Sequence, residues 1–205
     1  DNVLEIDPKY IAAINNRGIS LAELGNTDDA LEYYNKAIEI DPKYAAAYYN
    51  RGVLYDKLLK HEEAIQSLDE AIKCDSGNVN TAFYRGIVLG KMKKHEESLN
   101  CFENICRKHP KHMDAYFHKG MELAELGKHD KALAIFDKLL QIHEGNVNVI
   151  YAMARSNAAI ANIGRALYLL ELAVKKDRKT IKKWALEDEF FDSLQDEPKF
   201  RKLIR

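Results

Sequence analysis

Residues 45–78 decide the fold, and they read AAAYYNRGVLYDKLLKHEEAIQSLDEAIKCDSGN. Apolar side chains recur at helical spacing in 45–59 and again in 62–72, which predicts two amphipathic helices joined by a short turn. Gly52 and Ala64 lie on the two apolar faces, and both are small. Because a glycine inside a helix costs about 0.5–1 kcal/mol relative to alanine, Gly52 indicates that the two helices approach each other closely.

The same arrangement returns every 34 residues along the chain. Small residues recur at two positions of this period, and large apolar residues recur at a third. The recurring positions are Gly18, Gly52, Gly86 and Gly120; Ala30, Ala64, Ser98, Ala132 and Ala166; and Tyr34, Leu68, Phe102, Phe136 and Leu170. Such a period predicts a stack of helix pairs, in which each pair buries its apolar face against its neighbours.

Two Asp-Pro dipeptides lie at equivalent places of this period, Asp7-Pro8 and Asp41-Pro42. Aspartate can cap the free N–H groups at a helix N-terminus, and proline fits the first helical turn. We therefore expect a helix to start at each dipeptide.

The composition is that of a core-forming chain with almost no net charge. Hydrophobic residues make up 46% of the 205 residues, and 31 basic against 32 acidic side chains leave a net charge of −1. This balance gives no reason to expect nucleic acid or an acidic membrane as a partner. The apolar runs are also far shorter than the roughly 18–20 residues of a membrane helix. Cys74, Cys101 and Cys106 lack CxxC spacing, which favours a reducing, cytoplasmic compartment.

The segment Ala47–Tyr55, followed by Glu63, Ala64 and Leu68, resembles a tetratricopeptide repeat (TPR), whose signature has this 34-residue length. The resemblance covers about the first 180 residues. It implies an all-α fold, namely a right-handed superhelical solenoid of helix–turn–helix repeats with a C-terminal capping helical segment.

The chain then divides into five repeats and two flanking segments. The expected divisions are a remnant of a preceding repeat at 1–10, repeats at 11–44, 45–78, 79–112, 113–146 and 147–180, and a helical cap at 181–205. The fifth repeat is divergent, because Ala154 replaces the glycine and Asn157 replaces a large residue of the first helix. The tail carries apolar residues such as Phe191 and Phe200 that suit a structural cap; a separate docking motif is the alternative.

No phosphate-binding loop or catalytic group is recognisable in the sequence. Gly90-Lys91 and Gly127-Lys128 lack the upstream glycine of such a loop, and neither pair is followed by Ser or Thr. No serine or cysteine has a recognisable partner that would activate it as a nucleophile. We therefore expect neither enzymatic activity nor a cofactor.

Histidines also recur with the period, at His61, His95 and His129. Equivalent positions of successive repeats lie about one helix pair apart, and helices pack at about 8–10 Å. The three side chains therefore cannot share a metal ion, and we expect them to pack at turns. Cys106, with His109 and His112 nearby, lacks a fourth ligand and occupies a core position, so no metal site is expected.

In the tetratricopeptide repeat family, the first helices of the repeats line a concave groove that binds other proteins. We call the side chains of these helices that face the groove the binding stripe. The candidate binding residues on this stripe are Asn16, Tyr49, Asn50, Phe83, Tyr84, Ile87, Phe117, His118, Met121, Tyr151 and Arg155. Aromatic and methionine side chains make efficient contacts, and asparagine can pair with both groups of a peptide backbone.

Two sets of residues have structural alternatives. Tyr49, Phe83, Phe117 and Tyr151 share one position of the repeat, and this position can instead pack between repeats. A further ladder at 34-residue spacing points away from the groove, and we expect it to cover neighbouring helices; it consists of Arg17, Arg51, Arg85 and Lys119.

One subfamily clamps the C-terminal carboxylate of heat-shock chaperones with lysines, asparagines and an arginine. Asn50 matches that clamp. Asn15, Ile19, Asn80 and Tyr84 stand where the clamp needs a lysine, an asparagine, a second lysine and an arginine. These replacements argue against a chaperone carboxylate and favour an apolar or helical protein segment.

The sequence thus predicts a non-catalytic scaffold or adaptor that holds a peptide or helix in its groove. Two alternatives stay open. One is a self-association module that dimerises through the fifth repeat and the tail. The other is a regulatory TPR segment of a larger protein, because the chain begins without methionine inside an expected helix.

Overall fold

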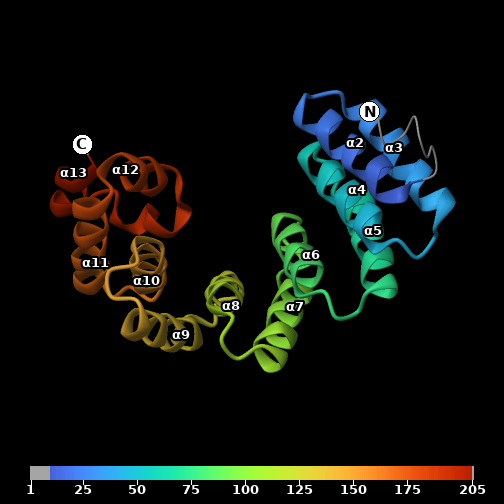
Figure 1. Cartoon of the computed structure of the whole chain (residues 1–205). Helices are drawn as coiled ribbons and strands as arrows, with labels where there is room; N and C mark the ends of the chain where they lie inside the picture. Colours follow the sequence, from blue (N-terminus) through green and yellow to red (C-terminus); the bar gives the residue numbers. More distant parts are fainter. Residues whose placement is uncertain (1–9, 205) are drawn as a thin grey trace. The chain divides into compact units, whose positions relative to one another are not determined.

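The computed structural model describes residues 10–204 (Figure 1). These residues form twelve α-helices and one 3-10 helix, and they contain no β-strand. The predicted all-α class is therefore confirmed. The predicted remnant at 1–10 lies outside the described residues except for Tyr10. No helix within 10–204 is both long enough and apolar enough to span a membrane.

Ten of the helices form five consecutive pairs. The first helices are α2 (Ile11–Glu23), α4 (Ala45–Lys57), α6 (Val79–Lys91), α8 (Met113–Glu125) and α10 (Val147–Ala159). The second helices are α3 (Thr27–Ile40), α5 (His61–Cys74), α7 (His95–Lys108), α9 (His129–Ile142) and α11 (Ile163–Lys176). Both sets begin at intervals of 34 residues, so the period of the sequence is the period of the helix pairs.

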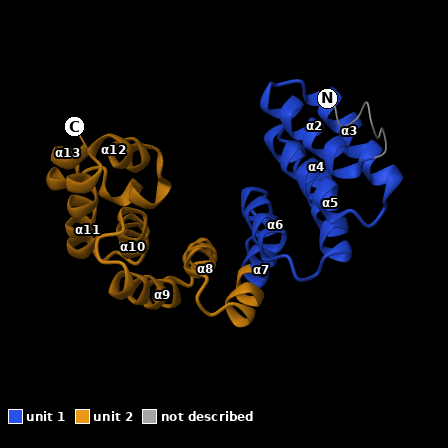
Figure 2. Cartoon of the chain, in the orientation of Figure 1, with its two compact units in different colours: residues 1–101 blue, residues 102–205 orange. Residues whose placement is uncertain are grey.

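The chain divides into two compact units, and the division falls inside α7, between Cys101 and Phe102 (Figure 2). In unit 1, α2 packs against α3, α3 against α4, α4 against α5 and α5 against α6. In unit 2, α8 packs against α9, α9 against α10 and α10 against α11. Within each unit, every helix pair is therefore held by the pair next to it.

Close packing between the two helices of a pair depends on the periodic glycines. A Cβ atom built on Gly52 would lie 2.9 Å from Cγ of Leu68, and one on Gly120 would lie 2.5 Å from Cε1 of Phe136. Leu68 and Phe136 are fully buried, so neither can move aside freely. The interpretation of these glycines as points of close approach is confirmed.

The expected helix start at Asp41-Pro42 is wrong. Asp41 is the C-terminal cap residue of α3, and α4 begins only at Ala45. The Asp41 carboxylate accepts a hydrogen bond from the backbone N–H of Lys43 at 2.9 Å. Aspartate side chains often bond the backbone two residues further on, so Asp41 stabilises the turn between pairs rather than a helix N-terminus. Asp7-Pro8 lies outside the described residues.

The divergent fifth pair buries a polar side chain, Asn157, whose amide is hydrogen-bonded at both ends. Ala154 stands in place of the glycine and is fully buried. Asn157 is also buried, and its Nδ2 donates to the backbone oxygen of Met153 at 2.8 Å. Its Oδ1 accepts from Nδ2 of Asn162 at 3.1 Å. Because a buried amide is costly unless it is hydrogen-bonded, these two bonds account for the polar residue.

A tail closes the end of unit 2. It consists of α12 (Arg178–Glu187), the 3-10 helix η1 (Glu189–Leu194) and α13 (Pro198–Ile204). α12 and α13 pack against α11, and η1 packs against α10 (Figure 1). Phe191, Leu194 and Phe200 are fully buried, and Lys199 pairs with Glu171 of α11 at 3.0 Å. The tail thus covers the apolar side of the last helix pair.

Candidate functional site

Two asparagine side chains on the first helices of unit 1 are hydrogen-bonded to each other. Asn50 on α4 donates from Nδ2 to Oδ1 of Asn15 on α2 at 2.9 Å. Asn15 is only 3% exposed, so this bond joins two adjacent pairs inside the packed structure. Asn16 is exposed, and in the part of the chain that the structure describes Oδ1 of Asn50 accepts no hydrogen bond. Of the two candidates, Asn16 is therefore exposed, and Asn50 is half-buried with one hydrogen bond to Asn15.

A buried carboxylate lies behind Tyr84. Asp56, at the end of α4, is 3% exposed. Its Oδ2 accepts hydrogen bonds from the Tyr84 hydroxyl and from Lys91 Nζ, each at 2.6 Å. Its Oδ1 lies 3.1 Å from Nδ1 of His61. Asp56 therefore ties together α4, α5 and α6, and Tyr84 serves this network as well as the surface.

The protonation states in this network follow from its geometry. Burial raises the pKa of Asp56, but the hydrogen bonds from Lys91 and Tyr84, with the charges of Lys91 and His61, outweigh it, so the pKa lies below its usual value. Burial, together with the hydrogen bond to Asp56 and the charge of that group, raises the pKa of Tyr84. At neutral pH Asp56 is an anion, and Tyr84 is a neutral donor.

Nothing in the sequence analysis singled out Asp56. The equivalent position of the other pairs holds Ala22, Gly90, Ala124 or Ala158. The sequence signal for this network was an acidic residue at a position that is otherwise small, because a charge at a crowded position needs partners.

The aromatic candidates of unit 1 lie partly inside the packing. The rings of Tyr49 and Tyr84 meet edge to face, with centroids 6.0 Å apart. Both rings pack against the buried cluster that contains Leu68. Phe83 and Ile87 on α6 are half-buried. These contacts support the structural alternative for Tyr49, which is half-buried.

In unit 2, two of the three candidates on α8, Phe117 and His118, have rings that contact each other. Phe117 packs against Phe136, with ring centroids 6.0 Å apart, and meets His118 edge to face at 5.4 Å. His118 also stacks on the fully buried Phe102 at 5.2 Å. Burial lowers the pKa of His118, against the charge of Asp114, which raises it. His118 is therefore a neutral ring at pH 7 and part of the packing.

The candidates Tyr151 and Arg155 on α10 are already engaged by the tail. Nε of Arg155 lies 2.6 Å from Oδ2 of Asp188, and its Nη2 lies 2.9 Å from Oε1 of Glu125 on α8. The Tyr151 hydroxyl donates to Oδ2 of Asp188 at 2.8 Å. Met121 is next to this group, with its Sδ 4.0 Å from Nη1 of Arg155. Sequence reasoning missed the role of Asp188, which lies 33 residues beyond Arg155.

The ladder of basic residues predicted from the sequence connects successive helix pairs. Nη1 of Arg51 donates to Asn35 at 2.7 Å, and Arg85 pairs with Asp69 at 2.6 Å. Each partner sits on the second helix of the preceding pair. In unit 2, Lys119 pairs with Glu103 at 3.1 Å in the same way. These contacts support the structural interpretation of the ladder.

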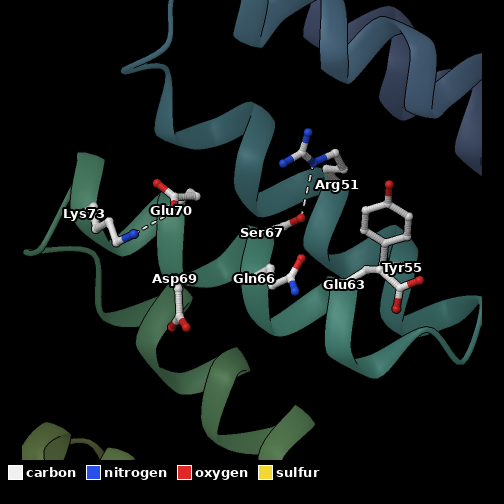
Figure 3. A pocket seen from close by; sticks show the side chains of 8 residues that line it. All are labelled: Arg51, Tyr55, Glu63, Gln66, Ser67, Asp69, Glu70 and Lys73. Atoms are coloured by element: carbon white, nitrogen blue, oxygen red, sulfur yellow. Dashed lines mark hydrogen bonds and ion pairs between the residues drawn. The ribbon is translucent and has the colours of Figure 1, made fainter.

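A polar pocket of about 510 Å³ lies beside this ladder (Figure 3). It is lined by Arg51, Tyr55, Glu63, Gln66, Ser67, Asp69, Glu70 and Lys73. Arg51 donates from Nε to Ser67 at 3.2 Å, and Lys73 pairs with Glu70 at 2.6 Å. Asp69 pairs with Arg85, so two of the three carboxylates that line this pocket, Asp69 and Glu70, have a cationic partner.

The periodic histidines lie at separate sites. His61 faces Asp56, and His129 meets the ring of Phe190 edge to face at 6.0 Å. Cys106 is buried, at 6% exposure. In the described residues, no three His, Cys, Asp or Glu side chains converge on a point that could hold a metal ion.

Family models agree with this architecture. One, described as a TPR repeat, matches residues 20–58, and two described as tetratricopeptide repeats match 45–78 and 85–147. No curated protein matches the chain in sequence.

Several solved structures share the fold. YrrB, described as a TPR protein with an unusual peptide-binding site, is 24% identical; the match covers 91% of this chain and 96% of that one, with a TM-score of 0.74. A MamA protein is 17% identical over 87% of this chain and 95% of that one, with a TM-score of 0.72. MamA from Desulfovibrio magneticus RS-1, from residue 41 to its end, is 16% identical over 82% and 95%, with a TM-score of 0.75. At these identities the likeness concerns the fold.

Proposed function

Because the chain belongs to the tetratricopeptide repeat family, which serves in general as a protein-interaction scaffold, we propose that it holds a peptide or helical segment of another protein against its first helices. The observation that carries the proposal is the pairing of open amides with half-buried apolar side chains on these helices. Asn16 and Asn50 offer donors and acceptors, and Ile87 and Met121 offer apolar contacts. An extended or helical segment needs both kinds of group.

The charged side chains of unit 1 indicate which kind of partner would fit. Lys91 on α6 is a cation of unit 1, and it is paired with Asp56. A C-terminal carboxylate would have to compete with Asp56 for Lys91, which supports an apolar segment over a chaperone tail. The shared fold with YrrB adds support, since that protein is described as having a peptide-binding site.

The proposal can be tested with peptide arrays probed by the whole chain, followed by affinity measurements on the hits. Asn50→Ala tests the proposed surface in unit 1, and Met121→Ala tests that in unit 2. Because Asn50→Ala also removes the hydrogen bond to the buried Asn15, circular dichroism establishes that this variant is folded. We expect at least one of them to weaken binding about tenfold or more, as central contact residues do.

Matched controls lie on exposed positions of second helices, at Gln66→Ala on α5 and Lys138→Ala on α9. They should leave the affinity unchanged. Unchanged affinity in both surface variants would place the ligand elsewhere and end the proposal. Light scattering of the free chain separates one of the two open alternatives, self-association, from binding of a different protein.

A further inference from the structure

The tail places one carboxylate against two side chains of the predicted binding stripe. Oδ2 of Asp188 lies 2.6 Å from Nε of Arg155 and accepts a hydrogen bond from the Tyr151 hydroxyl at 2.8 Å. Tyr151 is 7% exposed, and the side chains of Arg155 and Asp188 are 13% and 12% exposed. The carboxylate is thus held in a partly dehydrated site, paired with a cation and hydrogen-bonded by a hydroxyl.

An aromatic ring from the same segment completes the contact. The ring of Phe190 lies over the guanidinium of Arg155, with 4.3 Å between Cζ and the ring centroid. The ring also meets His129 edge to face at 6.0 Å. Arg155 therefore contacts a carboxylate and an aromatic face that are two residues apart in sequence, and both interactions are favourable for arginine.

Asp188 also caps η1, since its Oδ1 accepts from the backbone N–H of Phe190 at 3.2 Å, but other side chains fasten the tail to α10 and α11. Phe191, Leu194 and Phe200 are fully buried, whereas Phe190 is only half-buried. Lys199 and Glu171 tie α13 to α11 independently. The tail can therefore stay folded over α10 and α11 when Asp188 and Phe190 leave Arg155.

The charges make Asp188 the exchangeable member of the cluster. Arg155 already pairs with Glu125 on α8 at 2.9 Å, so the cluster holds one cation between two carboxylates. If Asp188 leaves, a neutral pair remains and no buried charge is stranded, which is the condition that makes such a loss tolerable.

We propose that Asp188–Phe190 is a built-in ligand of the stripe in unit 2, and that the partner carries the same chemistry: a carboxylate two residues before an aromatic ring. The partner segment displaces Asp188 and Phe190 and binds Arg155 and Tyr151 in their place. The proposal rests on the function proposed above and specifies the sequence class that this end of the surface recognises.

The test uses a fluorescent peptide with the sequence of residues 187–192, EDEFFD, and the whole chain. In the wild type, the built-in segment competes and the peptide binds weakly. In Asp188→Asn combined with Phe190→Ala, the site is vacated, and we expect at least tenfold tighter binding. Adding Arg155→Gln should abolish the gain. A peptide with Asn in place of its first Asp, or Ala in place of its first Phe, should bind about tenfold more weakly.

The matched control is Asp192→Asn, which removes an exposed carboxylate from the same 3-10 helix and should bind the peptide as the wild type does. Circular dichroism and the thermal midpoint establish that each variant is folded. If the double variant does not fold, Asp188→Asn alone is used, since it keeps the ring.

A folded vacated chain that binds EDEFFD no better than the wild type overturns the inference. This outcome is distinct from failure of the proposed function. Array peptides that bind the wild type through Asn50 or Met121 would still stand, and only the acid-and-aromatic chemistry at Arg155 would be lost.

Discussion

The turn inside each helix pair places one residue in the left-handed region of backbone space. The five equivalent residues, with their φ values, are Gly25 (84°), Leu59 (60°), Lys93 (58°), Gly127 (71°) and Ala161 (57°). Glycine adopts this region readily, whereas a residue with a side chain loses about 1–2 kcal/mol there. Three of the five turns are therefore strained at one residue.

Replacing Leu59 by glycine should stabilise the chain. Leu59 is 78% exposed, so little packing is lost, and relief of the left-handed strain outweighs the extra chain entropy of glycine by roughly 0.5–1 kcal/mol. Urea unfolding followed by circular dichroism measures the gain. Lys36→Gly, at an exposed position inside α3, is the control and should destabilise by about 1 kcal/mol. A loss of stability in Leu59→Gly would contradict the assignment of strain.

Asp56→Asn should lower stability at pH 7, and the loss should shrink in acid. The pKa of Asp56 is lowered in the folded chain, so its charge contributes stability above the unfolded pKa of about 3.9. That contribution disappears as the pH falls through the folded pKa. We expect a loss of about 1–3 kcal/mol at neutral pH, as for a hydrogen bond to a charged group.

Urea unfolding of both chains at pH 7, 5, 4 and 3 follows this effect. The difference between wild type and variant should hold down to about pH 5 and diminish below about pH 4. A difference that stays constant to pH 3 would show that the charge of Asp56 is not what stabilises the network.

At the scale of helices, the packing of a pair depends on which residue faces the periodic glycine. Gly120→Ala on α8 would place a methyl group 2.5 Å from Cε1 of Phe136 on α9. Overpacking of a core typically costs about 1–3 kcal/mol, and we expect a loss in this range. Thermal unfolding of the variant measures it.

The fifth pair indicates how that loss can be reversed. There, Ala154 occupies the glycine position and Leu170 occupies the position of Phe136, and both are fully buried. Adding Phe136→Leu to Gly120→Ala should therefore recover part of the stability, although Phe136→Leu alone leaves a cavity and destabilises. Additive losses in the double variant would mean that the two positions are not coupled.

At the scale of the whole molecule, each helix pair is held by its neighbours within a unit, so a defect should remain local. Phe200→Ala removes a fully buried ring from the tail and should cost about 3–5 kcal/mol. Amide exchange should accelerate in α10 to α13 and stay unchanged in α2 to α4. Lys202→Ala, at an exposed site of α13, is the control. Equal acceleration in both units would instead indicate one cooperative fold.

The sequence predicted the helices and their packing better than the side-chain contacts of the candidate site. The glycine period located the close approach at Gly52 and Gly120, because no larger residue fits there. Asp41 misled the prediction of a helix start, because its side chain has a competing bond in the turn. Apart from His61, the side chains that pair with Asp56 and Asp188 lie 28 to 37 residues away in sequence. Such long-range pairs follow from the stacking of the helices, which a local pattern does not reveal.

The ladder of Arg51, Arg85 and Lys119 has a consequence for how such a chain can lengthen. Each cation bonds a side chain on the second helix of the preceding pair, as Arg85 does with Asp69. If residues 45–78 were duplicated in tandem, Arg51 of the new copy would meet Asp69 of the old one, and Arg85 would meet Asp69 of the new copy. Both junctions would keep an arginine opposite an aspartate. Gene duplication could therefore add a pair at this point without first needing a compensating substitution in the ladder.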